Sequence, residues 1–168
     1  MKTKLISLLL LIFLGLGQNA CDSQETSTYY LIRHAEKDRT DSTNKNPHLT
    51  EAGHERALKW KKVLSSIEFD HIYSTDYHRT IETVTPIAEA QNLDIEFYNP
   101  SDMFDANFKA QTKGKVTLIS GHSNTTPFFA NRILQEERYE QIDDSNNANL
   151  YIVEIRGEHR SAQLLHIE

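Results

Sequence analysis

Residues 28–37 read TYYLIRHAEK, and this stretch decides the fold and the chemistry that we expect of the chain. Its first half, 28–32, is continuously aromatic, aliphatic or β-branched, which favours a strand buried on both faces. Arg33 and His34 follow directly. Ligands of open α/β sheets bind in the crevice at the carboxyl ends of the strands. A basic pair at the end of a buried strand therefore indicates a binding or catalytic site.

Downstream of this stretch, short β-rich runs alternate with helical patterns, which is typical of a layered α/β domain. Residues 37–48 are polar and predict a loop. Further strands are predicted at 71–74, 95–98, 115–120, 150–155 and 162–167, the last two forming a hairpin about Gly157. Helices are predicted after the caps Thr50 and Ser101, over 77–91 with a bend at Pro86, and over 125–134. The pattern predicts a single three-layer α/β/α sandwich with a mostly parallel sheet and a C-terminal antiparallel hairpin.

The first 20 residues differ in character from the rest of the chain. Lys2 and Lys4 precede an apolar run over 5–16, and Cys21 follows shortly after it, which is the layout of a secretory signal peptide. We expect a signal peptide at 1–20, a tether at 21–28 and the folded domain at 29–168. Cys21 resembles the lipid-modified cysteine of bacterial lipoproteins, and plain cleavage near Ala20 is the alternative. The protein is thus expected to be exported, either periplasmic or anchored to the membrane through Cys21.

The charge balance limits the kinds of partner. Without Lys2 and Lys4, the chain has 16 basic residues against 24 acidic ones, a net charge of −8 with histidines neutral. Nucleic-acid backbones are bound by a surplus of Lys and Arg. An acidic surface therefore argues against nucleic acid as a partner, and a phosphate site here must be a local exception.

Three unusual clusters each follow a predicted strand: Arg33-His34, residues 74–79 with Arg79, and His122-Ser123-Asn124. If they meet at one edge of the sheet, two arginines and two histidines form a cationic pocket. Guanidinium groups bind phosphate oxygens bidentately, and the N–H groups at a helix start add partial positive charge. The predicted phosphate-binding residues are Arg33, Arg79, His122, Ser123 and Asn124.

The order of these motifs resembles the histidine phosphatase superfamily, which is phosphoglycerate mutase-like in fold. The resemblance is carried by four segments: LIRHAEK at 31–37, HLTEAGHERA at 48–57, IYSTDYHRTIET at 72–83 and ISGHSNTTP at 119–127. It implies a phosphatase without metal or cofactor, in which His34 is the nucleophile and forms a phosphohistidine. Arg33, Arg79 and His122 would hold the phosphoryl oxygens. The size of the chain resembles the small phosphohistidine phosphatase branch.

The residue that protonates the leaving oxygen is less well defined. A poor leaving group requires a general acid, and Asp102 is the first choice, with Asp105 and Glu82 as the alternatives. The compact phosphohistidine phosphatases that the chain resembles work without such an acid.

Other functions remain open beside phosphomonoester hydrolysis. The first is a catalytically inactive phosphate-binding or scaffold protein of the same fold. Phosphoglycerate mutase-like transfer is a second, but it needs a lid that excludes water, and the chain is short. A metal site that uses a histidine with Glu36 and Asp38 fits no known ligand spacing. The expected substrate is a phosphorylated small molecule or a phosphate ester of the cell envelope.

Overall fold

The computed structural model describes residues 25–168. The predicted signal peptide, Cys21 and the first part of the predicted tether lie outside these residues. Within the part that is described, no helix combines the length and the apolar character needed to cross a membrane.

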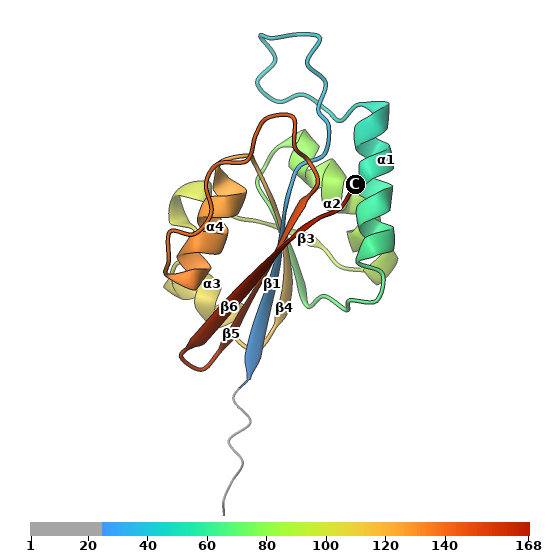
Figure 1. The fold of residues 1–168 in the computed structure, drawn as a ribbon. Helices are drawn as coiled ribbons and strands as arrows, with labels where there is room; N and C mark the ends of the chain where they lie inside the picture. Colours follow the sequence, from blue (N-terminus) through green and yellow to red (C-terminus); the bar gives the residue numbers. More distant parts are fainter. Residues whose placement is uncertain (1–24) are drawn as a thin grey trace, which may run out of the picture.

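The chain forms one sheet of six strands in the order β3-β2-β4-β1-β5-β6 (Figure 1). The pairs β1–β4, β4–β2 and β2–β3 are parallel, whereas β5 runs antiparallel to both β1 and β6. This confirms a mostly parallel sheet with a C-terminal antiparallel hairpin. The strand bounds are β1 Thr26–Arg33, β2 His71–Ser74, β3 Ile95–Phe97, β4 Val116–Gly121, β5 Asn149–Arg156 and β6 His159–His166.

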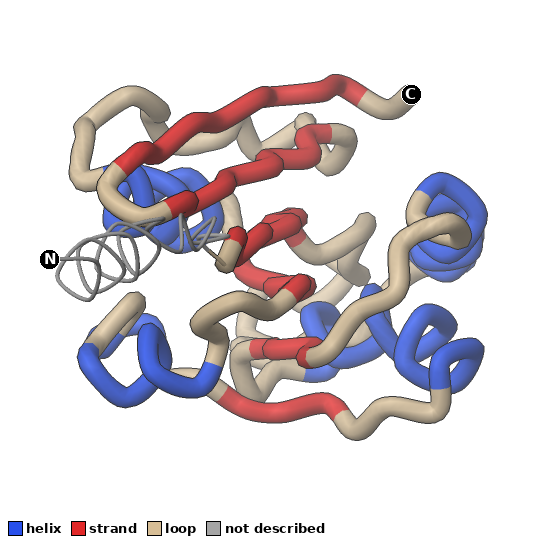
Figure 2. The backbone as a smooth tube through the Cα atoms, turned by 90° about the horizontal axis from the view of Figure 1, so that it is seen from below, coloured by secondary structure: helices blue, strands red, loops and turns tan. Residues whose placement is uncertain are grey.

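Helices cover both faces of the sheet, which confirms the three-layer sandwich. The helices over 51–63 and 78–91 pack into the core on one face, and those over 106–111 and 125–134 pack into the core on the other. Seen from below, the strands lie between these helices (Figures 1 and 2). The α-helices are α1 Glu51–Val63, α2 His78–Gln91, α3 Ala106–Gln111 and α4 Thr125–Leu134, and a 3₁₀ turn spans Pro100–Asp102.

The side chains of β1 alternate between two hydrophobic cores, one on each face of the sheet. Tyr29 and Leu31 are buried among the aromatic side chains of α3 and α4, including Phe108 and Phe129. Ile32 is buried on the other face, together with Trp60 of α1. Successive residues of a strand point to opposite faces. A strand that is apolar on both faces therefore has to lie inside the sheet, as β1 does.

The register of the central strands brings the predicted site clusters together. Arg33 at the end of β1 lies opposite Gly121 at the end of β4, and Ser74 at the end of β2 lies opposite Ser120. Because β4 lies between β2 and β1, the segments that leave all three strands start side by side. The three predicted clusters therefore do begin at one edge of the sheet, at the carboxyl ends of the parallel strands.

Two local predictions were wrong. β1 begins at Thr26, so residues 26–28 belong to the sheet and not to a tether, because they pair with β5 from Thr26 onward. The helix at 106–111 is capped by Asp105, whose side chain accepts from the backbone N–H of Phe108, and not by Ser101. Phe104 has a φ of +59°, which breaks any helix that starts before it.

Candidate active site

His34 is held with one ring nitrogen free. Its backbone N–H donates to the Gly121 carbonyl at 2.9 Å, which fixes the residue against the end of β4. Its Nδ1 lies 2.7 Å from the Ala35 carbonyl oxygen. A carbonyl can only accept, so Nδ1 carries the proton, and the neutral ring keeps its lone pair on Nε2. Nε2 is therefore the nitrogen available for bonding to a substrate.

The environment of His34 keeps the imidazole neutral. The side chain is buried, with 4% of its residue surface exposed. Burial, followed by the positive charge of Arg33, lowers the pKa of His34 to about 3, although the hydrogen bond to Ala35 opposes this shift. An imidazole with such a pKa is unprotonated at any physiological pH.

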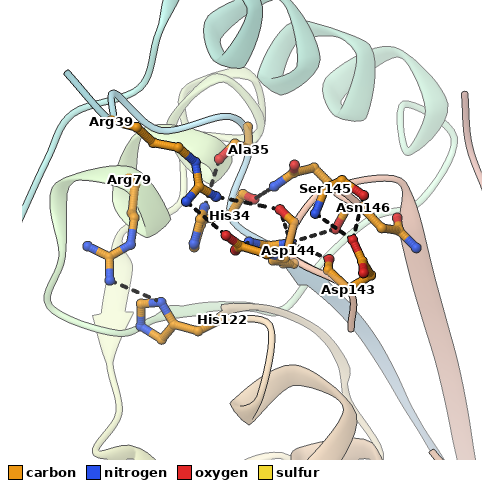
Figure 3. Close-up of polar contacts among 11 residues, drawn as sticks. His34, Ala35, Arg39, Arg79, His122, Asp143, Asp144, Ser145 and Asn146 are labelled. Carbon is orange, nitrogen blue, oxygen red and sulfur yellow. Dashed lines mark hydrogen bonds and ion pairs between the residues drawn. The ribbon is translucent and has the colours of Figure 1, made fainter. Parts of the chain in front are cut away.

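His122 faces His34 across the site, with ring centroids 5.6 Å apart. The Nη2 group of Arg79 lies 3.4 Å from Nδ1 of His122 (Figure 3). On the other side of the ring, Thr75 Oγ1 lies 2.9 Å from Nε2. Because a guanidinium only donates, Nδ1 accepts and Nε2–H donates to Thr75. Burial and the charge of Arg79 lower the pKa of His122 to about 4. The second imidazole is therefore neutral too.

Arg79 is anchored loosely. It stands in the first turn of α2, and its guanidinium lies over the Tyr77 ring at 4.5 Å. Its hydrogen bonds, to His122 and to the Lys45 carbonyl at 3.5 Å, are both long. Within residues 25–168, its buried Nε has no hydrogen-bond partner. Arg79 thus has N–H groups to spare for an anion.

Arg33 uses most of its donors on the protein itself. Nη1 donates to the carbonyls of Asp143, Asp144 and Asn146 at 2.8–3.1 Å, and Nη2 donates to the Asp144 carboxylate at 2.7 Å. A guanidinium has five N–H groups. Nε, which lacks a partner in the described part of the chain, and one N–H of Nη2 are left for a ligand. Arg33 therefore organises the loop 143–146 and retains at most a partial role in binding phosphate.

Asp144 is a site residue that the sequence did not reveal. Its carboxylate bridges Arg33 at 2.7 Å and Arg39 at 2.8 Å (Figure 3). Its hydrogen bond from Arg39, followed by that from Arg33, lowers the pKa of the Asp144 carboxyl to about 2. A carboxylate held between two guanidinium groups occupies the kind of position that a phosphate oxygen takes.

The comparisons with known proteins bear on this geometry. The model of the histidine phosphatase superfamily (branch 1) matches residues 29–99, which include His34 and Arg79. The predicted resemblance to histidine phosphatases is confirmed. No curated protein matches the sequence.

Several solved structures share the fold of this chain at low sequence identity. The alpha-ribazole phosphatase of Shigella flexneri is 14% identical, with a TM-score of 0.65 over 83% of this chain and 96% of that one. Phosphoglycerate mutase of Bacillus anthracis is 13% identical, with a TM-score of 0.64 over 85% and 94%. SixA of Agrobacterium tumefaciens, a candidate phosphohistidine phosphatase, is 18% identical, with a TM-score of 0.59 over 83% and 97%. At these identities the likeness shows the fold.

Two further hydrogen bonds hold the backbone around His34 in place. Asn147 Nδ2 donates to the His34 carbonyl at 2.7 Å, and the Ala35 N–H donates to Thr83 Oγ1 at 2.8 Å. Both partners are buried. Neither was predicted as a site residue. Thr83 lies inside the IYSTDYHRTIET motif, which could have indicated it, whereas Asn147 lies in the long acidic loop outside every motif.

The remaining predicted site residues differ in placement. Asn124 occupies the N-cap position of α4, but its side chain makes no capping hydrogen bond. The backbone carbonyl of Ser123 accepts from the Ile142 N–H at 2.8 Å. Asp102 accepts from Asn99 Nδ2 at 2.9 Å and lines a hollow of about 220 Å³ with Tyr98 and Phe108. The structure therefore brings His34, Arg79 and His122 together, but it shows no hydrogen bond from Asp102 to any of them.

Proposed function

We propose that the protein hydrolyses a phosphomonoester through a phosphohistidine on His34, without a metal ion. Phosphatase activity as such rests on the histidine phosphatase match over residues 29–99. The phosphohistidine on His34 is supported by the Nδ1 hydrogen bond to the Ala35 carbonyl. This hydrogen bond leaves a lone pair on Nε2 of a neutral ring. Arg79 and His122 flank that ring.

In the first step, Nε2 of His34 bonds to phosphorus while the bond from phosphorus to the ester oxygen breaks. The leaving oxygen departs with the electron pair and takes up a proton. In the second step, water attacks the phosphohistidine, the N–P bond breaks, and inorganic phosphate leaves with His34 restored. Charge spreads over the phosphoryl oxygens in both transition states, where fixed donors contribute most. The spare N–H groups of Arg79 supply such donors.

We retain Asp102 as the proposed proton donor for alkyl phosphates, supported by its carboxyl group on the turn that follows β3. To act, Asp102 has to exchange its hydrogen bond with Asn99 for one with the substrate. Asp102→Asn should then slow an alkyl phosphate far more than p-nitrophenyl phosphate, whose leaving group needs little protonation. Equal effects on the two substrates would exclude Asp102 as the acid.

The proposed substrate is a phosphorylated small molecule or a phosphate ester of the cell envelope. One solved structure of this fold is described as an alpha-ribazole phosphatase, and another as a phosphoserine phosphatase variant in complex with phosphoserine. An acidic chain with a local cationic site favours a compact anion over a nucleic acid. A panel of phosphorylated metabolites tested on the protein would narrow the class.

The decisive experiment is a rapid quench in alkaline detergent, which preserves the acid-labile N–P bond, during turnover of ³²P-labelled p-nitrophenyl phosphate near pH 6. The label should appear on His34 and should be lost in His34→Ala, which is expected to reduce kcat by on the order of 10³-fold or more. His54→Ala, a change of an exposed histidine on α1, should keep both label and turnover. A folded wild-type protein that binds phosphate but neither turns over nor takes up label would instead support the phosphate-binding or scaffold function.

We also propose export with a signal peptide at 1–20 and lipid attachment at Cys21. The support is the sequence alone: Lys2 and Lys4, the apolar run over 5–16 and the cysteine that follows. Cell fractionation of the full chain and of Cys21→Ser tests both parts. Export with lipid attachment places the wild type in the membrane fraction and the variant in the soluble exported fraction. A wild type found in the cytoplasm would contradict export.

A further inference from the structure

A cluster of two histidines and a glutamate lies outside the proposed chemistry. His48, His78 and Glu82 each offer a ligand atom, and these atoms lie within 4.8 Å of one another. His48 stands just before α1, whereas His78 and Glu82 are one turn apart on α2. The phosphohistidine mechanism uses none of the three.

The geometry points to a binding site for a divalent transition-metal ion, Zn²⁺ in the first place, formed by His48, His78 and Glu82. Two imidazoles and one carboxylate are a common protein ligand set for zinc. Both histidines are exposed, which leaves the outer side of the site open for a water molecule as the fourth ligand. Ligand atoms around tetrahedral zinc stand about 3.4 Å apart, and small rotations of exposed side chains reach that spacing from the present one.

The orientation of Glu82 supports this assignment. One carboxylate oxygen accepts from the backbone N–H of Leu49 at 2.8 Å, and the other faces Nδ1 of His48. The backbone hydrogen bond can persist when a metal binds the second oxygen, and it then fixes the direction of the ligand, as outer contacts do in known sites. The carboxylate is thus oriented before any ion arrives.

The two imidazoles lie face to face beside the Glu82 carboxylate. Their rings stack with centroids 4.0 Å apart and an interplanar angle of 15°. The lone pair of an imidazole lies in the ring plane, so one of the stacked rings has to turn before both can bind the same ion. Both histidines are exposed, and such a turn lets each neutral ring donate a lone pair to a single zinc ion.

The site joins two segments that both carry cationic residues. His48 ends the polar segment that contains Lys37 and Arg39, and His78 precedes Arg79 on α2. Two hydrogen bonds also attach the segment to α2: the His78 N–H donates to Asn46 Oδ1 at 2.9 Å, and Arg79 donates to the Lys45 carbonyl at 3.5 Å. A bound ion would therefore fasten the segment to α2 without taking part in phosphoryl transfer.

Isothermal titration of the full chain with Zn²⁺ near neutral pH, together with metal analysis after dialysis, tests the site. We expect one ion per chain and a rise in Tm of roughly 5 °C once zinc is in large excess over its Kd. His78→Phe keeps a ring to stack on His48 but has no ligand atom, and Glu82→Gln can still accept from Leu49. Each should weaken binding on the order of 100-fold.

The controls separate this site from other metal ligands and from catalysis. His54→Phe and Cys21→Ser remove an exposed histidine of α1 and the only thiol, and both should bind zinc as the wild type does. His34→Ala should also bind normally, so a failure of the phosphohistidine mechanism does not affect this test. Unchanged affinity in His78→Phe and Glu82→Gln, or no binding by the wild type, would overturn the proposal.

Limited trypsin digestion gives a second readout. Arg39 and Lys45 are exposed cleavage sites in the segment that the ion would fasten. Zinc should slow cleavage after them several-fold in the wild type and in His54→Phe, but not in His78→Phe. Equal protection in all three proteins would show that zinc acts elsewhere, and the proposed fastening would be wrong.

Discussion

The two arginines of the site are held in opposite ways, although the sequence suggests the same role for both. Arg33 ends β1, is fully buried, and donates to three carbonyls and a carboxylate of the loop 143–146. Arg79 begins α2 and makes only hydrogen bonds of 3.4–3.5 Å. N–H groups that already donate to the protein stabilise its structure, whereas unused N–H groups can bind a ligand. Arg33 therefore mainly supports the loop 143–146, whereas Arg79 has the unused N–H groups that the proposed phosphate site requires.

Arg79→Met should show the largest effect and should act on turnover alone. Methionine fills a similar volume but has no donor for the phosphoryl oxygens. We expect kcat/KM for p-nitrophenyl phosphate to fall by on the order of 10²- to 10³-fold. The free energy of unfolding, measured in urea, should change by less than about 1 kcal/mol because the lost hydrogen bonds are long. A large loss of stability would remove the contrast with Arg33.

Arg33→Met should differ by reducing stability as well as activity. It leaves the carbonyls of Asp143, Asp144 and Asn146 without their donor. Unpaired polar groups of this kind cost about 1–3 kcal/mol each when buried, but this loop can partly turn to solvent. We expect the free energy of unfolding to drop by about 2–4 kcal/mol. Arg33→Lys, which keeps the charge, should recover part of it, and a fully stable Arg33→Met would show that the loop does not depend on Arg33.

The sequence predicted the elements of the fold better than it predicted these roles. β1 and the cap at Thr50 follow from local patterns, and the placing of Arg33, Arg79 and His122 follows from the rule that parallel strands end at one edge. The Arg33 partners could not be predicted, because Asp144 lies 111 residues away in a loop with no motif. Local sequence near Asp144 indicates only a turn.

The pH dependence of stability tests whether His34 and His122 are neutral in the folded protein. The pKa of His34 is lowered to about 3 in the folded protein, against an ordinary value of 6.5. Between these two pH values the unfolded chain binds a proton that the native protein does not bind. Stability should therefore fall as the pH is lowered through this window, and His122, with a pKa of about 4, adds to the effect. His34→Gln should lessen the slope by up to about 1.4 kcal/mol per pH unit, as measured by urea unfolding at several pH values. An unchanged slope would contradict the neutral, buried His34.

Asp144→Asn should give the smallest effect, and it tests whether the loop only supports Arg33 or also competes with substrate. The Asp144 side chain is 66% exposed, so its ion pairs with Arg33 and Arg39 should contribute less than about 1 kcal/mol to stability. An amide oxygen at this position can still accept from Arg33, but the negative charge beside the phosphate pocket is gone. We expect KM for an anionic substrate to fall about two- to fivefold at low ionic strength, and the difference should shrink as salt is added. Asp143→Asn is the matched control, because it removes the same charge from a carboxylate whose hydrogen bonds stay within the loop, to Ser145. If both variants lower KM equally, the effect is one of general charge, and the bridging position of Asp144 between the two guanidinium groups has no role in substrate binding.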